Sequence, residues 1–276
     1  MRSRAIGDFA VMSLPTVIGF TLSLLLIIGS ILELTTNFKI FLHLSGLLMV
    51  IGGTLAAANV GFEARYVKQA LGNIKAIFFS PKMARGMLTN EVARVIRWGY
   101  LLQKSGIQAL ESDVKSLKGQ DAFLAYGVGL VVSGYTGEEV RHMLDNQVET
   151  AFQRHTVSVE ILKYMASNAP AFGMMATLVG LVVMLDNMGD DPSKLGAGMA
   201  VGLLGTLYGV LFARLILMPA AEKAHQRESI IRFRNMLVAE GLVMLAERRS
   251  PRFIQDAMNS YLDPAIHFDI DKAPKK

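Results

Sequence analysis

Four long stretches of this sequence contain no Asp, Glu, Lys or Arg, and they constrain the fold more than any other feature. They comprise 24, 23, 22 and 19 residues and lie at 9–32, 40–62, 164–185 and 195–213. A helix needs about 20 apolar residues to cross the hydrocarbon core of a bilayer, so each stretch is long enough. We therefore predict four transmembrane helices, the last extending to about residue 218 (195–218).

The composition supports a membrane protein and excludes several other classes. The chain is 52% hydrophobic and 18% charged, with a mean hydropathy of +0.38, which is too apolar for an ordinary soluble domain. It has no cysteine, so disulfides, thiolate nucleophiles and cysteine-ligated metals are excluded. The five histidines show no ligand spacing, and no catalytic triad, phosphate loop or pair of carboxylates is present. We predict no metal, no cofactor and no enzyme.

The distribution of Lys and Arg predicts the orientation. The loops 33–39 and 186–194 carry one basic residue each, whereas 63–163 carries 13 and the chain from Arg214 onward carries 11. The positive-inside rule then places both termini and the central region in the cytoplasm. Basic cytoplasmic loops also account for the net charge of +5, so no nucleic-acid partner is predicted.

Two apolar segments need separate interpretation. The first stretch follows Arg2 and Arg4 but is too long for a signal peptide, and we interpret it as a retained signal anchor. Residues 122–137 are apolar, but only 16 residues there are free of charge. A fifth span would also carry the basic tail to the wrong side, so we predict a buried or interfacial helix.

The predicted fold is an all-α integral membrane protein with four transmembrane helices. A first hairpin, 1–62, is followed by a helical cytoplasmic insert, 63–163. A second hairpin, 164–221, leads to a helical cytoplasmic tail, 222–276. Within the insert, Thr136-Gly-Glu-Glu139 has the spacing of a capping box and predicts the start of a helix.

The third and fourth stretches each place small residues on one helix face. Residues 168–181 read NAPAFGMMATLVGL. The shared faces comprise Pro170, Gly173, Thr177 and Gly180 in the third stretch, and Gly198, Gly202, Gly205 and Gly209, with Thr206 beside them, in the fourth. Small residues permit close helix packing in lipid, which is one explanation.

The two threonines permit a second explanation. A rise of 1.5 Å per residue places Thr177 roughly 12 Å and Thr206 roughly 17 Å inside the outer ends of their spans. Both are thus expected near mid-membrane, where their hydroxyls either line a polar path or bond back to the preceding helical turn.

Ionisable carboxylates and amines are absent from all four stretches. A protein that moves ions by itself usually keeps such a group in the membrane. If this chain conducts ions, the titrating carboxylate must come from another subunit. His43, at the outer end of the second stretch, is the only group there that titrates near neutrality, and we expect it at the interface.

These residues resemble those of a known family. NAPAFGMMATLVGLVVML, the loop DNMGDDPSK and LGAGMAVGLLGTLYGVLFARLILMPAAEK are similar to the third and fourth spans of flagellar motor stator A subunits, the MotA/PomA family. The four-span layout, GGT at 52–54 and QKSGIQALESD at 103–113 agree with it.

The resemblance implies a partner and a function. It implies a ring of A subunits, expected to be a pentamer, around two B subunits (MotB/PomB-like) in the bacterial inner membrane. Each B subunit contributes one transmembrane helix with an essential aspartate and a peptidoglycan-binding domain. Transported H⁺ or Na⁺ would pass beside that aspartate, and motion of the A subunits would turn the rotor through the switch protein FliG.

The resemblance also implies roles for residues in the spans. Thr177 and Thr206 match hydroxyl positions that face the B-subunit aspartate, and Gly173, Gly180 and Gly205 are expected on the same side. Threonine at 177 is a feature of sodium-driven members and favours Na⁺. Two departures from the family are Ala176, in place of a common glycine, and Gly205, in place of a residue that is often a second threonine.

Prolines match the family's two functional prolines at Pro170 and Pro219. Each is either a hinge or a fixed kink, and the family match favours a hinge. Because proline lacks an N–H, Pro170 leaves a carbonyl one turn earlier without its helical partner. Ser167 and Asn168 are the nearby groups expected to bond to it.

In the insert, Glu111 matches the acidic residue of the family that contacts the rotor. The arginine that precedes this position by eight residues in the family is Gln103 here, and the adjacent Lys104 is the candidate for its positive charge.

Three alternatives remain from the sequence. Motors of the ExbB/TolQ type have three spans and carry the insert after the first, unlike this layout. Phage-defence motor subunits carry a long helical tail, whereas only about 55 residues follow Ala221 here. A membrane scaffold without ion flux would use the glycines for packing alone.

Overall fold

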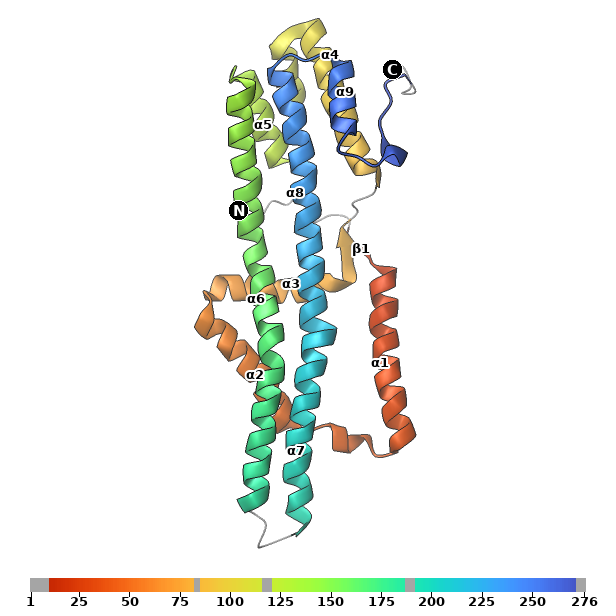
Figure 1. Cartoon of the computed structure of the whole chain (residues 1–276), viewed down its shortest axis with the longest axis vertical. Coiled ribbons are helices and arrows are strands. Elements are labelled where there is room, and N and C mark those ends of the chain that lie inside the picture. Colours follow the sequence, from red (N-terminus) through yellow and green to blue (C-terminus); the bar gives the residue numbers. More distant parts are fainter. Residues whose placement is uncertain (1–9, 82–84, 116–120, 187–191, 272–276) are drawn as a thin grey trace. The chain divides into compact units, whose positions relative to one another are not determined.

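The computed structural model describes residues 10–81, 85–115, 121–186 and 192–271, and it is almost entirely helical (Figure 1). The α-helices are α1 (Leu14–Leu34), α2 (Leu44–Gly61), α3 (Ala64–Lys75), α4 (Arg85–Lys115), α5 (Ala122–Val132), α6 (Gly137–Asp186), α7 (Pro192–Leu211), α8 (Met218–Ala246) and α9 (Pro251–Asn259). Short 3₁₀ turns are η2 (Phe38–Phe41), η3 (Ala76–Phe78) and η5 (Pro264–Ile266), and η4 (Phe212–Leu217) is a π-helix. Two three-residue strands, β1 (Ala10–Met12) and β2 (Phe79–Pro81), pair with each other, which the sequence did not predict.

Four helices in the described part of the chain are long and apolar enough to cross a membrane. They are Leu14–Leu34, Lys39–Gly61, Gly137–Asp186 and Gly198–Ala246. The predicted all-α class with four spans is thereby confirmed. The first helix begins with Pro15 in its first turn, where proline's missing N–H has no cost. Residue 9, where the first stretch was expected to begin, lies outside the described residues.

The fifth apolar segment forms a short buried helix, as predicted. It is α5, with 11 residues, and six of them are buried: Phe123, Leu124, Gly127, Val128, Leu130 and Val131. Asp121 caps its N-terminus, accepting hydrogen bonds from the N–H groups of Phe123 at 3.1 Å and Leu124 at 3.0 Å. A helix this short is packed inside protein rather than across a bilayer.

The chain divides into two compact units. The span unit comprises Val11–Ser80 and His155–Gln226. The insert–tail unit comprises Pro81–Arg154 and the residues from Arg227 on, together with the segment that ends at Ala10. Each has its own apolar core. That of the span unit includes Ala58, Val67, Ile161, Leu162, Met165, Ala169, Ala213 and Leu217. That of the insert–tail unit includes Val95, Trp98, Leu124, Leu144, Leu237, Leu242 and Ile254.

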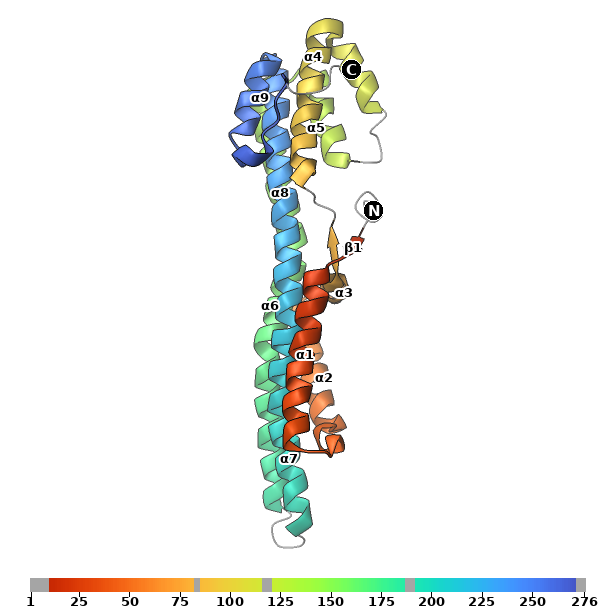
Figure 2. The same ribbon diagram turned by 90° about the vertical axis from the view of Figure 1, so that its right-hand side faces the viewer.

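Within the span unit, α6 and α7 run side by side in both views (Figures 1 and 2). Their outward side chains are apolar and largely exposed, among them Met174, Leu178, Val182 and Leu203. In α1 every residue is at least partly exposed. Such faces suit lipid or neighbouring transmembrane helices.

Candidate functional site

Glycines bring the backbones of α6 and α7 into direct contact. A Cβ atom added at Gly180 would lie 2.5 Å from the carbonyl oxygen of Gly198, and one at Gly173 would lie 2.7 Å from that of Gly205. Real Cβ atoms essentially never approach so closely. Close packing, one of the two explanations open from the sequence, therefore accounts for the glycines. Gly173, Gly180 and Gly205 are buried in this contact, and their predicted orientation toward a partner stays a prediction.

The two predicted threonines meet across the same contact. Their hydroxyl oxygens lie 2.7 Å apart, so Thr177 of α6 and Thr206 of α7 are hydrogen-bonded. The Thr177 hydroxyl also lies 2.8 Å from the carbonyl oxygen of Gly202 and 3.2 Å from that of Gly173. Thr206 lies 3.4 Å from the same Gly173 oxygen. The threonines thus contact each other, Thr177 also bonds back to Gly173 of its own helix, and both hydroxyls reach carbonyl oxygens of the opposite helix.

The two threonine hydroxyls have fewer hydrogens than they have oxygen neighbours. Four pairs of oxygen atoms lie within hydrogen-bond distance, but each hydroxyl has one hydrogen and the carbonyl oxygens only accept. Some of these oxygens are therefore free to bind another group. Both threonines are half-buried, so a group outside the chain can reach them. Hydroxyl and carbonyl oxygens are the ligands that hard cations prefer, and they also accept hydrogen bonds from a protonated carboxyl group.

Pro170 lies inside α6, which continues without interruption. Ser167 and Asn168 each donate a hydrogen bond of 2.8 Å to the carbonyl oxygen of Tyr164. The expectation that they pair with the carbonyl freed by Pro170, that of Ala166, is therefore wrong. Serine and asparagine in a helix reach the carbonyl three or four residues back, which for both is Tyr164.

A glycine of α7 faces this proline. A Cβ atom on Gly209 would lie 2.6 Å from the carbonyl oxygen of Ala169 and 3.1 Å from the Cα of Pro170. Because residue 209 has no side chain, the turn of α6 that contains Pro170 can pack directly against α7. Pro170 thus belongs to the same close contact as the threonines.

Pro219 follows a change in helix type. It lies in the first turn of α8, directly after the π-helix η4. A π-helix accommodates an extra residue in one turn and occurs often at functional sites. Because α7, η4 and α8 run on as one helix over Gly198–Ala246, Pro219 removes one N–H from the backbone hydrogen bonds of that helix. The only sign of this irregularity in the sequence is a proline within an apolar helical stretch.

Lys223 lies one turn after Pro219 and was not singled out from the sequence. Its ammonium group donates hydrogen bonds to the Ser13 hydroxyl at 2.8 Å, to the carbonyl of Ile77 at 3.0 Å and to the Thr16 hydroxyl. It thereby links the start of α1 and the 3₁₀ turn η3 to α8. No local pattern announces partners so distant in the sequence.

The predicted rotor-contact residues lie on one hairpin. Helix α4 is interrupted at Gly106, whose backbone angles of φ 74° and ψ −173° are not helical. We call residues 97–113 the Gly106 hairpin. Gln103 and Lys104 lie just before the turn and Glu111 lies on the returning arm, and all three are exposed.

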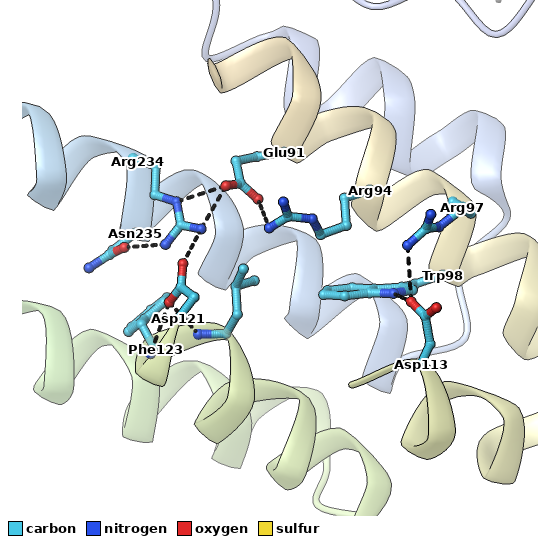
Figure 3. A network of polar contacts seen from close by, with 10 residues as sticks. Glu91, Arg94, Arg97, Trp98, Asp113, Asp121, Phe123, Arg234 and Asn235 are labelled. Carbon is cyan, nitrogen blue, oxygen red and sulfur yellow. Dashed lines mark hydrogen bonds and ion pairs between the residues drawn. The ribbon is translucent and has the colours of Figure 1, made fainter. Parts of the chain in front are cut away.

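A buried ionic cluster joins α4, α5 and α8 in the insert–tail unit (Figure 3). Arg234 donates to Glu91 through Nε at 3.1 Å and Nη2 at 2.6 Å, and its Nη2 lies 2.5 Å from Asp121. Arg94 lies 2.9 Å from the other oxygen of Glu91. Burial alone would lower the pKa of Arg234, but Glu91 and Asp121 outweigh it and raise the pKa. We call these four residues the Arg234 cluster.

Known proteins similar to this chain are found over nearly its whole length. The family model described as the MotA/TolQ/ExbB proton channel family matches residues 115–236. Motility protein A of Cereibacter sphaeroides is 31% identical over 91% of this chain and 96% of that protein. Chemotaxis protein PomA of Vibrio alginolyticus is 29% identical over 94% and 92%. The solved structure of C. jejuni MotAB matches with a TM-score of 0.80 and 23% identity, covering 96% of this chain and 100% of that chain, and so has the same fold.

Proposed function

The chain belongs to the MotA/PomA family of motility proteins, within the MotA/TolQ/ExbB proton channel family, and we propose that it converts ion flux into rotation of a flagellar motor. In this proposal it is the A subunit of a stator, a multi-pass protein of the bacterial inner membrane with both termini in the cytoplasm. The relatives named motility protein A and the fold shared with MotAB support it.

One observation carries the ion-conducting part of the proposal. The oxygen cluster at Thr177 and Thr206 lies between spans that contain no carboxylate. An ion path needs a titrating or coordinating group, and polar groups inside a membrane often mark such a path. A B subunit that supplies a transmembrane aspartate opposite these hydroxyls would complete the path.

The proposed cycle couples the membrane path to the rotor. Binding of H⁺ or Na⁺ beside the partner's aspartate neutralises its charge and changes the packing of the surrounding A-subunit helices. Pro170 and Pro219 lie in the helices that would move, and they act as hinges in this proposal. The Gly106 hairpin, with Gln103, Lys104 and Glu111 exposed, then acts on the rotor protein FliG. A ring of A subunits, expected to be a pentamer, would repeat this step around two B subunits.

Replacing Thr206 tests the ion path. In Thr206→Val the shape is kept but the hydroxyl is lost, and we expect torque to require a higher ion concentration, by roughly 2- to 10-fold for one hydrogen bond or ligand. Thr206→Ser, which keeps the hydroxyl, should retain most of the torque. The measurement is the speed of tethered cells as sodium is varied at constant pH, and as pH is varied without sodium. The first series responds if Na⁺ is the ion, and the second if it is H⁺.

A matched control comes from α1. The Ser23 hydroxyl bonds to the carbonyl of Gly19 in its own helix, so Ser23→Ala removes a hydroxyl from a span without touching the cluster. It should leave the ion dependence unchanged. Unchanged speed and ion dependence in both Thr206→Val and the equivalent Thr177→Val would instead favour a non-conducting scaffold.

A further inference from the structure

The Gly106 hairpin turns at a glycine, which has no side chain to pack against the rest of the unit. The φ of +74° with ψ near 180° is a backbone conformation essentially restricted to glycine. A Cβ atom added at Gly106 would meet nothing within 4 Å. The turn therefore sets the course of the chain but holds neither arm in place. The orientation of the returning arm must be fixed by contacts elsewhere.

Among the described residues, Leu110 and Asp113 of the returning arm contact the rest of the insert–tail unit. Leu110 is fully buried in the apolar core, which anchors the arm but is not directional. Asp113 provides direction, because its Oδ2 accepts a hydrogen bond of 2.7 Å from the indole Nε1 of Trp98 and one of 3.0 Å from Arg97 (Figure 3). Leu110 acts as a pivot, and Asp113 fixes rotation about it.

The burial of the partners makes the indole bond the stronger constraint. Trp98 is 0% exposed, whereas the Arg97 side chain is 63% exposed and that of Asp113 is 32% exposed. A buried N–H that loses its acceptor carries its full desolvation cost, whereas an exposed ion pair contributes little. The oxygen of Asp113, more than its charge, therefore holds the arm.

We infer that Asp113 is a positioning residue for the rotor-facing surface: by accepting the Trp98 N–H it fixes the arm that presents Glu111 beside Gln103 and Lys104. The inference rests on the proposed function, because it assumes that this hairpin acts on the rotor. Glu111 lies two residues before Asp113, so a change in the rotation of the arm moves its carboxylate directly.

The chain carries its own reporter of this bond. Trp98 is the single tryptophan in the sequence, so the fluorescence of the full-length chain, purified in detergent, reports the hairpin. In wild type the buried indole should be poorly quenched by acrylamide. Asp113→Ala should increase the open population about 10-fold or more, with a red-shifted emission and stronger quenching, because Trp98 loses its acceptor. Asp113→Asn keeps an acceptor oxygen and should remain shielded.

Motility of the same variants separates positioning from direct contact. Asp113→Ala should impair swimming, and Asp113→Asn should restore most of it. If Asp113→Asn abolishes swimming while Trp98 stays shielded, Asp113 acts through its charge on the rotor and the inference is overturned. It is equally overturned if Asp113→Ala leaves Trp98 shielded. Ser112→Ala, on the same arm and bonded only to Ala109 of its own helix, is the control expected to change neither readout.

Glu111→Ala distinguishes failure of the inference from failure of the proposed function. It should impair swimming without exposing Trp98. Suppose that Glu111→Ala swims normally while Asp113→Ala exposes Trp98. The bond between Asp113 and Trp98 would then hold the arm, but its role in the rotor contact would be refuted. If Asp113→Ala does not accumulate in the membrane, Trp98→Phe removes the same bond from the other side and keeps the aromatic packing. Trp98→Phe should then impair swimming, and a Trp98→Phe variant that swims normally would contradict the inference.

Discussion

The α6–α7 contact and the Arg234 cluster are both buried, but they hold helices together by opposite means. In the first, glycines remove side chains and let backbones touch. In the second, four charged side chains fill the space between α4, α5 and α8. Lipid gives no hydrophobic force between helices, so association there depends on close approach. In the insert–tail unit an apolar core supplies the force, and the ionic cluster adds direction.

The difference predicts how each region fails. The α6–α7 contact should fail sterically, when an atom is added. The Arg234 cluster should be destabilised when one charged side chain is removed, because a buried charge is then left without its partner. The two regions can therefore be broken separately, and each has a neighbouring residue that serves as its control.

The largest effect is expected from Arg234→Met. Glu91 and Asp121 would keep their negative charges with only Arg94 to balance them, and removal of one partner from a buried ion pair costs about 3–5 kcal/mol. Thermal or denaturant unfolding of the insert–tail unit, followed by the fluorescence of Trp98 in the purified chain, measures the loss.

The control is Arg232→Met, two residues earlier in α8. Arg232 pairs with Glu149 at 2.8 Å, but the two side chains are 40% and 45% exposed to solvent. Exposed pairs contribute about 0–1 kcal/mol, so the loss should be correspondingly small. Equal losses in the two variants would show that burial of the Arg234 cluster does not set its contribution.

A smaller effect is expected from Gly180→Ala in the α6–α7 contact. The added methyl group would meet a backbone oxygen, which cannot rotate away, and overpacking of this kind costs typically about 1–3 kcal/mol. Gly196→Ala is the matched control, since a Cβ atom there meets nothing within 4 Å. Thermal unfolding of the detergent-solubilised chain, followed by circular dichroism, compares the two. Equal stability of both variants would refute the steric account of this contact.

The sequence predicted what depends on local composition. Charge-free stretches predicted the four spans, and the residue spacing brought Thr177 and Thr206 to the same helix contact. The capping box at Thr136 was also predicted correctly, with the Glu139 carboxylate accepting from the Thr136 N–H at 2.8 Å. The family resemblance, carried mainly by the third and fourth spans, is confirmed by the relatives.

What the sequence did not predict depends on pairing between distant residues. Arg234 and Glu91 lie 143 positions apart, and Lys223 and Ser13 lie 210 apart, so no local pattern connects them. The π-helix before Pro219 and the turn at Gly106 are backbone features of one or two turns. They depend on how the flanking helices pack, which composition does not specify.

The smallest expected effect is a response to pH at the start of α6, in the insert–tail unit, that the α6–α7 contact should not show. Glu139 lies at the start of α6, far before the apolar stretch that begins at Tyr164, and hydrogen bonds from the Thr136 N–H and hydroxyl lower its pKa. Because the folded pKa is below the ordinary glutamate value, this stabilisation is present above the ordinary value. It is lost as the pH falls through the lowered one. Amide hydrogen exchange at 137–140 should therefore lose protection on acidification, after correction for the intrinsic exchange rate.

Two variants and one internal comparison sharpen this prediction. Glu139→Gln keeps an acceptor but not a titrating group, so the added pH dependence at 137–140 should disappear, whereas Glu138→Gln, one residue earlier, should retain it. The stretches that form the α6–α7 contact, 164–185 and 195–213, contain no Asp, Glu or His, so no side chain there changes charge on acidification. Its corrected protection should not change with pH. A loss of protection there in step with 137–140 would mean that the start of α6 and the glycine contact open as one cooperative unit, and that their different chemistry does not make them independent.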